Sequence, residues 1–239
     1  MSRNRVRSSL SLFFALAVGI LSTTASAQTF NRTFSVPADA ADLEVVNQVG
    51  TIKVLPAGSG GKIAILGKTS DGEARIDATQ TPQGRVKVQV TGRGTVDLEI
   101  TAPAATNLDL LCFKCTVLVT NMAGPLHARN TDGQILLNGV RSPRVEAHST
   151  KGSIGFTGEI LPSGKYTLKS FSGRIDVTVP AGADFKLSAS SYRGGIDLGG
   201  FAFRFEKQTD QLVEASLGAA RATVSIWTQE GSIHLHRKS

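Results

Sequence analysis

Apolar and polar residues alternate along most of this chain, and the alternation recurs around a regularly placed glycine. In each copy, apolar residues stand seven and five positions before the glycine and two and four positions after it. The copy at Gly173 has Tyr166, Leu168, Ile175 and Val177 at these places. Cys115 takes the place of the glycine in one copy. The glycines that carry the pattern are Gly50, Gly133, Gly152, Gly173, Gly194 and Gly231.

The spacing of these copies predicts the fold class. From Cys115 to Gly194 the key positions lie 18 to 21 residues apart. Alternation with a period of two is typical of half-buried strands, and no segment shows convincing helical periodicity. A repeat of this length built from short strands predicts an all-β, parallel β-helix-like solenoid whose equivalent residues stack about 4.8 Å apart. We interpret the glycines as structural turn residues, because a repeated turn often needs the positive φ that glycine adopts without a Cβ clash.

Residues 55–107 interrupt the glycine spacing. Alternating stretches at 62–66, 74–78, 85–90 and 95–100 are separated by turns that contain glycine. Short strands with tight turns predict an antiparallel meander. A solenoid needs such a section at its end, because a bare terminal rung exposes unpaired backbone N–H and C=O groups. We therefore expect one solenoid domain over residues 28–239, with an antiparallel strand section at 55–107.

The first 27 residues have the composition of a secretory signal peptide. Three arginines precede an apolar run at 10–21, and small residues precede a cleavage point between Ala27 and Gln28. The apolar run is shorter than the roughly 20 residues of a membrane span, although an uncleaved anchor is the alternative. We expect a mature chain that begins at Gln28, has no transmembrane anchor after signal removal, and is exported to the periplasm or the cell surface.

The charge of the chain argues against a nucleic-acid partner. Residues 1–27 carry three arginines and no acidic residue, so their removal lowers the formal net charge from +7 to +4. The remaining basic residues are scattered, and aromatic residues make up only 6% of the chain. A nucleic-acid-binding domain would show a basic patch or stripe. Weak attraction to anionic glycans or lipid headgroups stays open.

Short segments around the key positions share a residue order. Examples are Thr131-Asp132-Gly133-Gln134-Ile135 and Phe171-Ser172-Gly173-Arg174-Ile175. Strands that end in a proline followed by small residues recur as well, as at Val179-Pro180-Ala181. These segments resemble the bacterial putative-adhesin family, whose members are exported domains of unknown function. The resemblance covers nearly all of residues 30–236. It implies a β-solenoid fold and carries over no catalytic residue.

Cys112 and Cys115 are the only cysteines, and they are three residues apart. In an exported chain a disulfide is the default expectation, and this separation permits one where the chain turns. A possible disulfide would hold the one turn that lacks glycine. Two packed free thiols are the alternative. No helix follows that would lower a thiolate pKa, so redox activity is not expected.

Two acidic residues share one outward column of the repeat. Asp176 and Asp197 each stand three positions after a glycine, so consecutive rungs would place them near 5 Å apart. Two carboxylates at that separation could act in a retaining glycosidase or bind Ca²⁺. A solvated pair beside Arg174 and Arg193 is the simpler interpretation.

The histidines give the other candidate chemistry. His234 and His236 flank Leu235 and could share a metal ion on one face of a strand, but two ligands without a third do not define a site. His127 and His148 stand at ordinary outward positions. Nucleophile, phosphate-binding and metalloprotease motifs are missing from the sequence. We therefore predict no catalytic residue, no metal site and no cofactor.

Together these patterns predict a non-catalytic structural or adhesive module of the cell envelope. Its partner would be an unknown envelope protein or glycan, and its oligomeric state stays open. Two alternatives remain. One is a β-helix enzyme that acts on polysaccharides through Asp176 and Asp197. The other is an accessory protein of envelope stress or signalling that binds a membrane partner.

Overall fold

The computed structural model describes residues 29–39, 41–58, 60–70 and 73–238. All regular secondary structure in these ranges is β-strand. This part of the chain accordingly holds no helix of the length and apolarity that crossing a bilayer requires. The expected cleavage point between Ala27 and Gln28 lies outside the described residues.

The strands follow one another through short turns. They are β1 (Thr29–Ser35), β2 (Asp42–Pro56), β3 (Lys62–Thr69), β4 (Arg75–Gln80), β5 (Val86–Thr91), β6 (Val96–Ala102), β7 (Asn107–Thr120), β8 (Leu126–Asp132), β9 (Ile135–Val140), β10 (Arg144–Lys151), β11 (Ile154–Gly158), β12 (Lys165–Ser172), β13 (Ile175–Pro180), β14 (Phe185–Ser191), β15 (Ile196–Asp197), β16 (Arg204–Gln208), β17 (Leu212–Leu217), β18 (Ala222–Glu230) and β19 (Ile233–Lys238).

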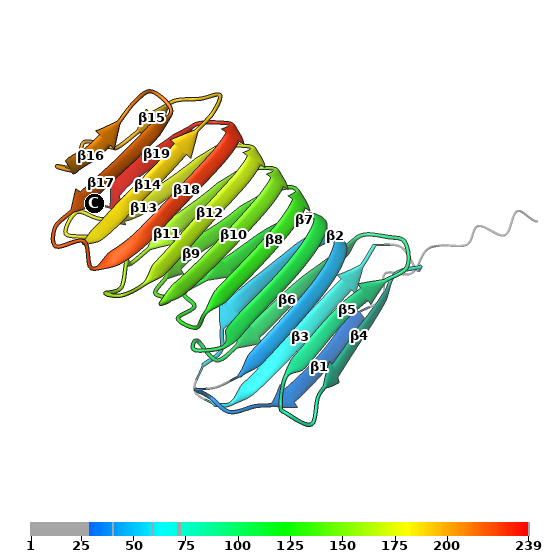
Figure 1. Cartoon of the computed structure of the whole chain (residues 1–239). Coiled ribbons are helices and arrows are strands. Elements are labelled where there is room, and N and C mark those ends of the chain that lie inside the picture. The colour runs from blue at the N-terminus through cyan, green and yellow to red at the C-terminus, as the bar shows by residue number, and fades with distance from the viewer. Residues whose placement is uncertain (1–28, 40, 59, 71–72, 239) are drawn as a thin grey trace, which may run out of the picture.

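Each rung of the solenoid contributes one strand to each of two stacked layers (Figure 1). The first layer has the order β4, β5, β2, β7, β8, β10, β12, β18, β14, β17, β16. The second layer has the order β1, β3, β6, β2, β7, β9, β11, β13, β19, β15. The long strands β2 and β7 pass through the corner and belong to both. Neighbouring rungs pair in parallel, which confirms the predicted all-β solenoid.

The core lies between the two layers and consists of the predicted apolar columns. Alternate residues of every rung point inward, so one column holds Leu43, Leu108, Leu126, Val145, Tyr166, Val224 and Leu187, all buried. Among the apolar residues of the pattern, only Ile196 and Leu198 are less than fully buried, and both lie in the rung at the C-terminal end.

The glycine corners are tight because the backbones of neighbouring rungs approach closely there. A Cβ atom on Gly173 would lie well inside contact distance of the carbonyl oxygen of Gly152, and one on Gly231 would meet that of Gly173. Positive φ explains only part of the pattern. Gly50, Gly133 and Gly152 have φ between 119° and 149°, whereas Gly173, Gly194 and Gly231 do not have positive φ. Close stacking is therefore the requirement that all the corner glycines share.

A buried polar column supports the same corners, three residues before each glycine. Ser170 Oγ donates to the carbonyl oxygen of Gly152 at 3.0 Å, and Ser191 Oγ donates to that of Gly231 at 2.8 Å. The column consists of Asn47, Cys112, Asn130, Ser149, Ser170, Thr228 and Ser191. In five of these seven rungs the side chain donates to the corner carbonyl of the neighbouring rung. Each such bond satisfies a buried acceptor that would otherwise carry a desolvation cost.

The order of the rungs departs from the order of the chain at both ends. Near the C-terminus, β18 lies between β12 and β14, and β19 lies between β13 and β15. Figure 1 shows the orange-red strand β18 in this slot. Near the N-terminus, β2 lies between β7 and the rung made by β5 and β6. The rung formed by β2 and the rung formed by β18 and β19 therefore lie inside the stack, although these strands stand near the two ends of the described chain.

The section at 55–107 contains antiparallel pairs, as expected, but it is not the predicted meander. β4 pairs antiparallel with β5, and β3 pairs antiparallel with β6. However, β3 does not pair with β4, and β5 and β6 instead form a parallel rung on β2. The sequence pattern hides this rung because Val88 and Leu98 are ten residues apart, whereas the residues they stack on, Val45 and Ile52, are seven apart.

Candidate functional site

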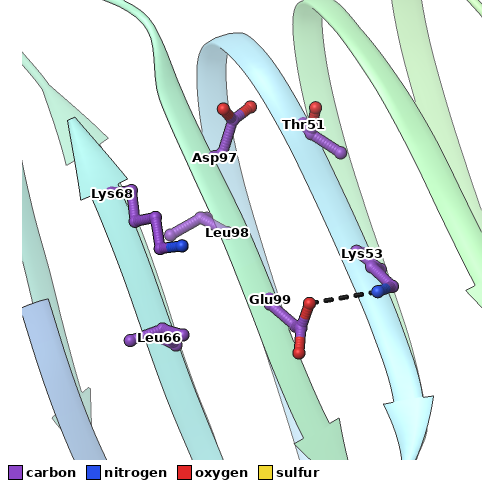
Figure 2. Close-up of a pocket in the computed structure, with 7 residues that line it drawn as sticks. All are labelled: Thr51, Lys53, Leu66, Lys68, Asp97, Leu98 and Glu99. Atoms are coloured by element: carbon purple, nitrogen blue, oxygen red, sulfur yellow. Dashed lines mark hydrogen bonds and ion pairs between the residues drawn. The ribbon is translucent and has the colours of Figure 1, made fainter. Parts of the chain in front are cut away.

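Several shallow hollows on the described residues could receive a ligand, among them one on the outer face of each layer. The first has a volume of about 290 Å³ and lies over β2, β3 and β6. Figure 2 shows that its centre is occupied by an ion pair, with Lys53 Nζ 3.0 Å from Glu99 Oε2. Lys68 and Asp97 add one further charge of each sign. The charges of this hollow balance, so it favours neither an anionic nor a cationic ligand.

The second hollow is a groove of about 360 Å³ across β7, β8, β10, β12 and β18. Equivalent outward positions on successive strands supply Arg129, His148, Lys169 and Trp227, which are cross-strand neighbours in that order. Phe171 joins the groove from the corner, and 51% of its surface is exposed. The groove thus combines a row of basic side chains with two aromatic rings.

His148 lies at the centre of this row. Its partial burial lowers the pKa of the imidazole below its ordinary value, and the positive charge of Lys169 lowers the pKa further. The Nε2 atom of His148 is buried and makes no hydrogen bond to the described residues. No carboxylate among the described residues lies within ion-pair distance of Lys169, whereas Arg129 is 3.4 Å from Asp109. Lys169 is therefore the cation of the groove that has no ion-pair partner among the described residues.

A second histidine lies on the same face, beside the groove. His127 Nδ1 is 3.6 Å from Asp109 Oδ1, and His127 Nε2 is 3.9 Å from Glu146 Oε2. The two ring nitrogens face opposite carboxylates on neighbouring rungs. This arrangement can form a row of alternating charges along the face. It does not bring three side chains together around one metal position.

The carboxylate pair expected at Asp176 and Asp197 is not formed. Both residues are in register with His234, which lies between them on β19. Asp176 instead accepts a hydrogen bond from Arg174 Nε at 2.8 Å, and Asp197 accepts one from the Gly199 backbone N–H at 2.9 Å. The expectation of adjacent rungs is wrong because the last strand of the chain inserts between them. The retaining-glycosidase geometry of about 5 Å is therefore not met.

The same insertion brings a third side chain to the expected histidine pair. The candidate ligand atoms of Asp176, His234 and His236 all lie within 4.8 Å of one another. The sequence alone could not supply this third residue, because Asp176 is 58 positions before His234.

Cys112 and Cys115 form a disulfide in the structure, with their Cα atoms 5.9 Å apart. Cys112 occupies the buried polar column, and Cys115 occupies the corner. The bridge thus stands where other rungs use a side-chain hydrogen bond and a glycine. Sequence reasoning missed the polar column itself, although serine, threonine or asparagine precedes every corner glycine by three positions.

The comparisons with known proteins agree with this architecture. A sequence profile described as Toastrack DUF4097 matches residues 116–236, just over half of the chain. The chain belongs to the Toastrack DUF4097 family. This membership confirms the resemblance to a putative-adhesin family of unknown function. A search of curated protein sequences finds no significant match.

Solved structures show the fold that this Toastrack DUF4097 chain shares. A putative cell adhesion protein from Clostridium sporogenes aligns with a TM-score of 0.55 and 12% sequence identity, over 89% of this chain and 100% of its own. A putative adhesin from Bacteroides fragilis aligns with a TM-score of 0.39 and 10% identity, over 88% of this chain and 98% of its own. At such identities the first likeness establishes the fold alone.

Proposed function

We propose that this chain is a non-catalytic, exported binding module of the cell envelope that attaches to an acidic glycan through the groove of Arg129, His148, Lys169, Phe171 and Trp227. The carrying observation is that Lys169, which has no ion-pair partner among the described residues, lies on one face with Arg129, the exposed ring of Phe171 and the half-buried ring of Trp227. The name of the Clostridium sporogenes structure as a putative cell adhesion protein supports the same role without identifying a ligand.

The chemistry of the groove fits a sugar that carries carboxylate or sulfate groups. Lys169 would pair with an anionic group, since charge-assisted hydrogen bonds are about twice as strong as neutral ones. Trp227 and Phe171 offer flat apolar faces with rigid side chains, which give contact area at low entropic cost. Because the basic residues stand on successive strands about 4.8 Å apart, they would meet an extended chain at regular intervals.

A non-catalytic role is consistent with the surroundings of the candidate groups. Asp176 and Asp197, the two carboxylates that a hydrolase would need, are separated by His234 and engaged with other groups. Among the described residues no carboxylate makes a hydrogen bond or ion pair with His148, and its two neighbours in the row are cations. A general base normally needs an orienting partner of this kind.

Binding to immobilised heparin, hyaluronate and neutral dextran tests the proposal. The unaltered chain should bind one of the acidic polymers with an affinity that falls as salt rises, and should not bind dextran. Lys169→Ala should weaken that binding about tenfold, since a hydrogen bond to a charged group contributes about 1.5–3 kcal/mol. Trp227→Ala should weaken it by a similar factor through the loss of apolar contact area. Lys62→Ala, an exposed lysine on β3, is the matched control and should bind like the unaltered chain. Equal binding by all four proteins, or binding to neither acidic polymer, would refute the groove as the glycan site.

A further inference from the structure

The outer face of the second layer carries a cluster of three metal-ligating side chains outside the groove. Asp176 comes from β13, and His234 and His236 come from β19. The strands are parallel neighbours, with Asp176 opposite His234 and Thr178 opposite His236. Since residues two apart on a strand point to the same face, the two imidazoles and the carboxylate project to the same side.

The separations within the cluster are close to those of a metal site. His236 Nε2 lies 3.6 Å from Asp176 Oδ1, and the candidate ligand atoms of all three residues lie within 4.8 Å of one another. Tetrahedral ligands at bond lengths of about 2.0–2.1 Å are about 3.3 Å apart. The side chains therefore need to close by only about 1.5 Å, which the exposed imidazole of His236 and the half-buried one of His234 can do by rotating.

Neighbouring side chains already orient two of the three ligands. Arg174 Nε donates to Oδ2 of Asp176 at 2.8 Å, which leaves Oδ1 facing His236. Ser232 Oγ lies 2.8 Å from His234 Nε2. If Nε2–H donates to this hydroxyl, Nδ1 keeps its lone pair for a metal ion. Hydrogen bonds of this kind fix the tautomer and orientation of metal ligands in known sites.

We propose that Asp176, His234 and His236 bind one divalent transition-metal ion of the zinc class. Two imidazoles with one carboxylate match the nitrogen and oxygen donors of Zn²⁺, whereas Ca²⁺ and Mg²⁺ prefer all-oxygen sites. The charge of Arg174 beside Asp176 reduces the attraction for a cation, so the site should bind zinc more weakly than a buried structural site. Three protein ligands leave room for water in the remaining position.

The position of the cluster in the fold assigns the ion a structural role. β19 is part of the last segment of the chain and is inserted between β13 and β15. A metal bound by one residue of β13 and two of β19 would join this inserted strand to the rung before it. Because the site forms only in the folded chain, bound metal would stabilise the fold by mass action.

Zinc binding by the full chain, purified without a polyhistidine tag, tests the proposal. Equilibrium dialysis should give one zinc ion per chain, and calcium should not compete. His236→Gln and Asp176→Asn should each weaken zinc binding by at least about tenfold, since even the residues that orient metal ligands contribute that much. Added zinc should raise the melting temperature of the unaltered chain and leave that of His236→Gln unchanged.

His127→Gln and Asp197→Asn are the matched controls. His127 is also exposed beside carboxylates, but its ring nitrogens face opposite ways, and Asp197 neighbours His234 from the far side. Both variants should bind zinc like the unaltered chain. Stoichiometry of zero, or a loss of binding that is the same in His127→Gln as in His236→Gln, would overturn the site. The altered residues are surface-facing, and a circular dichroism spectrum like that of the unaltered chain would show that each variant folds.

Discussion

At the N-terminal end of the solenoid, the outermost rung is covered in both layers. β4 pairs with β5, and β3 pairs with β6 and carries β1 on its other side. At the C-terminal end, β17 and β16 cover the outermost rung only in the first layer, beyond β14. Its second-layer strand, β15, has two residues and pairs with no described strand other than β19. The two ends therefore differ in how completely they bury the last apolar residues.

This difference shows what a capping strand contributes beyond pairing the sheet edge. Ile100, in the covered N-terminal rung, is fully buried, whereas Leu198, at the open C-terminal rung, is only partly buried. The added strand thus removes apolar side chains from water as well as satisfying backbone groups. The corners differ too, because a disulfide holds one near the N-terminal end, and serine and threonine hydroxyls hold those near the C-terminal end.

The largest expected effect separates the two terminal rungs. Ile100→Ala should lower the free energy of unfolding by about 2–5 kcal/mol, because it leaves a cavity in a fully buried site. Leu198→Ala, the comparable change at the C-terminal end, should lower it by about 1 kcal/mol or less. Urea unfolding followed by circular dichroism measures both. Equal losses would show that the C-terminal rung is as well covered as the N-terminal one.

Substitution of a corner glycine should also cost more stability at an inner rung than at the outermost C-terminal rung. Gly173→Ala places a methyl group against the carbonyl of Gly152 while the next rung, at Gly231, prevents the backbone from moving away. We expect a loss of up to about 3 kcal/mol, the upper range for overpacking. Gly194→Ala should lose less, since its rung is outermost and can shift outward. Gly182→Ala, where a Cβ meets no atom within 4 Å, is the control and should be near neutral in the same urea titration.

Two substitutions can replace the disulfide at Cys112 and Cys115 by the serine and glycine found at the corners nearer the C-terminal end. Reducing Cys112–Cys115 should lower the free energy of unfolding by about 2 kcal/mol, from the loop-closure entropy of a four-residue ring. The double variant Cys112→Ser with Cys115→Gly should regain about 1 kcal/mol through a hydroxyl bond to the neighbouring carbonyl. The matched variant, Cys112→Ala with Cys115→Gly, has no such donor. If the serine and alanine variants unfold at the same urea concentration, the polar column does not stabilise this corner.

The smallest expected effect is a dependence of the unfolding free energy on pH, caused by the protonation of His148 in the groove. Burial, Lys169 and His127 hold the pKa of His148 below its ordinary value of 6.5, with Arg129 acting in the same direction and Glu146 opposing it. The unfolded chain therefore binds the proton first, so stability is unaffected above pH 6.5 and decreases as the pH falls below it. His148→Gln should flatten this part of a plot of unfolding free energy against pH. An unchanged slope would place the titrating group elsewhere.

The apolar columns could be predicted from the sequence because burial between two layers imposes a strict alternation, as at Tyr166 and Leu168. The sequence could not predict which rungs stack next to each other. Every rung has the same apolar spacing, so the pattern of β14 is equally compatible with pairing to β12 and with pairing to β18. Nothing local in residues 222–238 marks them for insertion. This single ambiguity produced the wrong pairing of Asp176 with Asp197 and concealed the approach of Asp176 to His234 and His236.

The polar column and the groove were missed for a different reason. Asn47, Asn130, Ser170 and Thr228 differ in size and chemistry, so their shared role appears only when the neighbouring carbonyl is in view. Lys169 and Trp227 stand at equivalent outward positions, yet 58 residues separate them along the chain. A search for a small polar residue three positions before each corner would have revealed the column.

The position of β18 and β19 between earlier strands determines when the solenoid can finish folding during synthesis. During synthesis, residues 185–198 emerge before the segment that must separate them from β12 and β13. Until residues 222–238 have left the ribosome, β14 can form its native pair with β17 but lacks its neighbour β18, and direct docking on β12 would be a misfolded arrangement. The order of biosynthesis and the order of stacking thus disagree here, as they do at the rung of β2, and the rungs of β12 to β15 reach their native arrangement only after residues 222–238 are free.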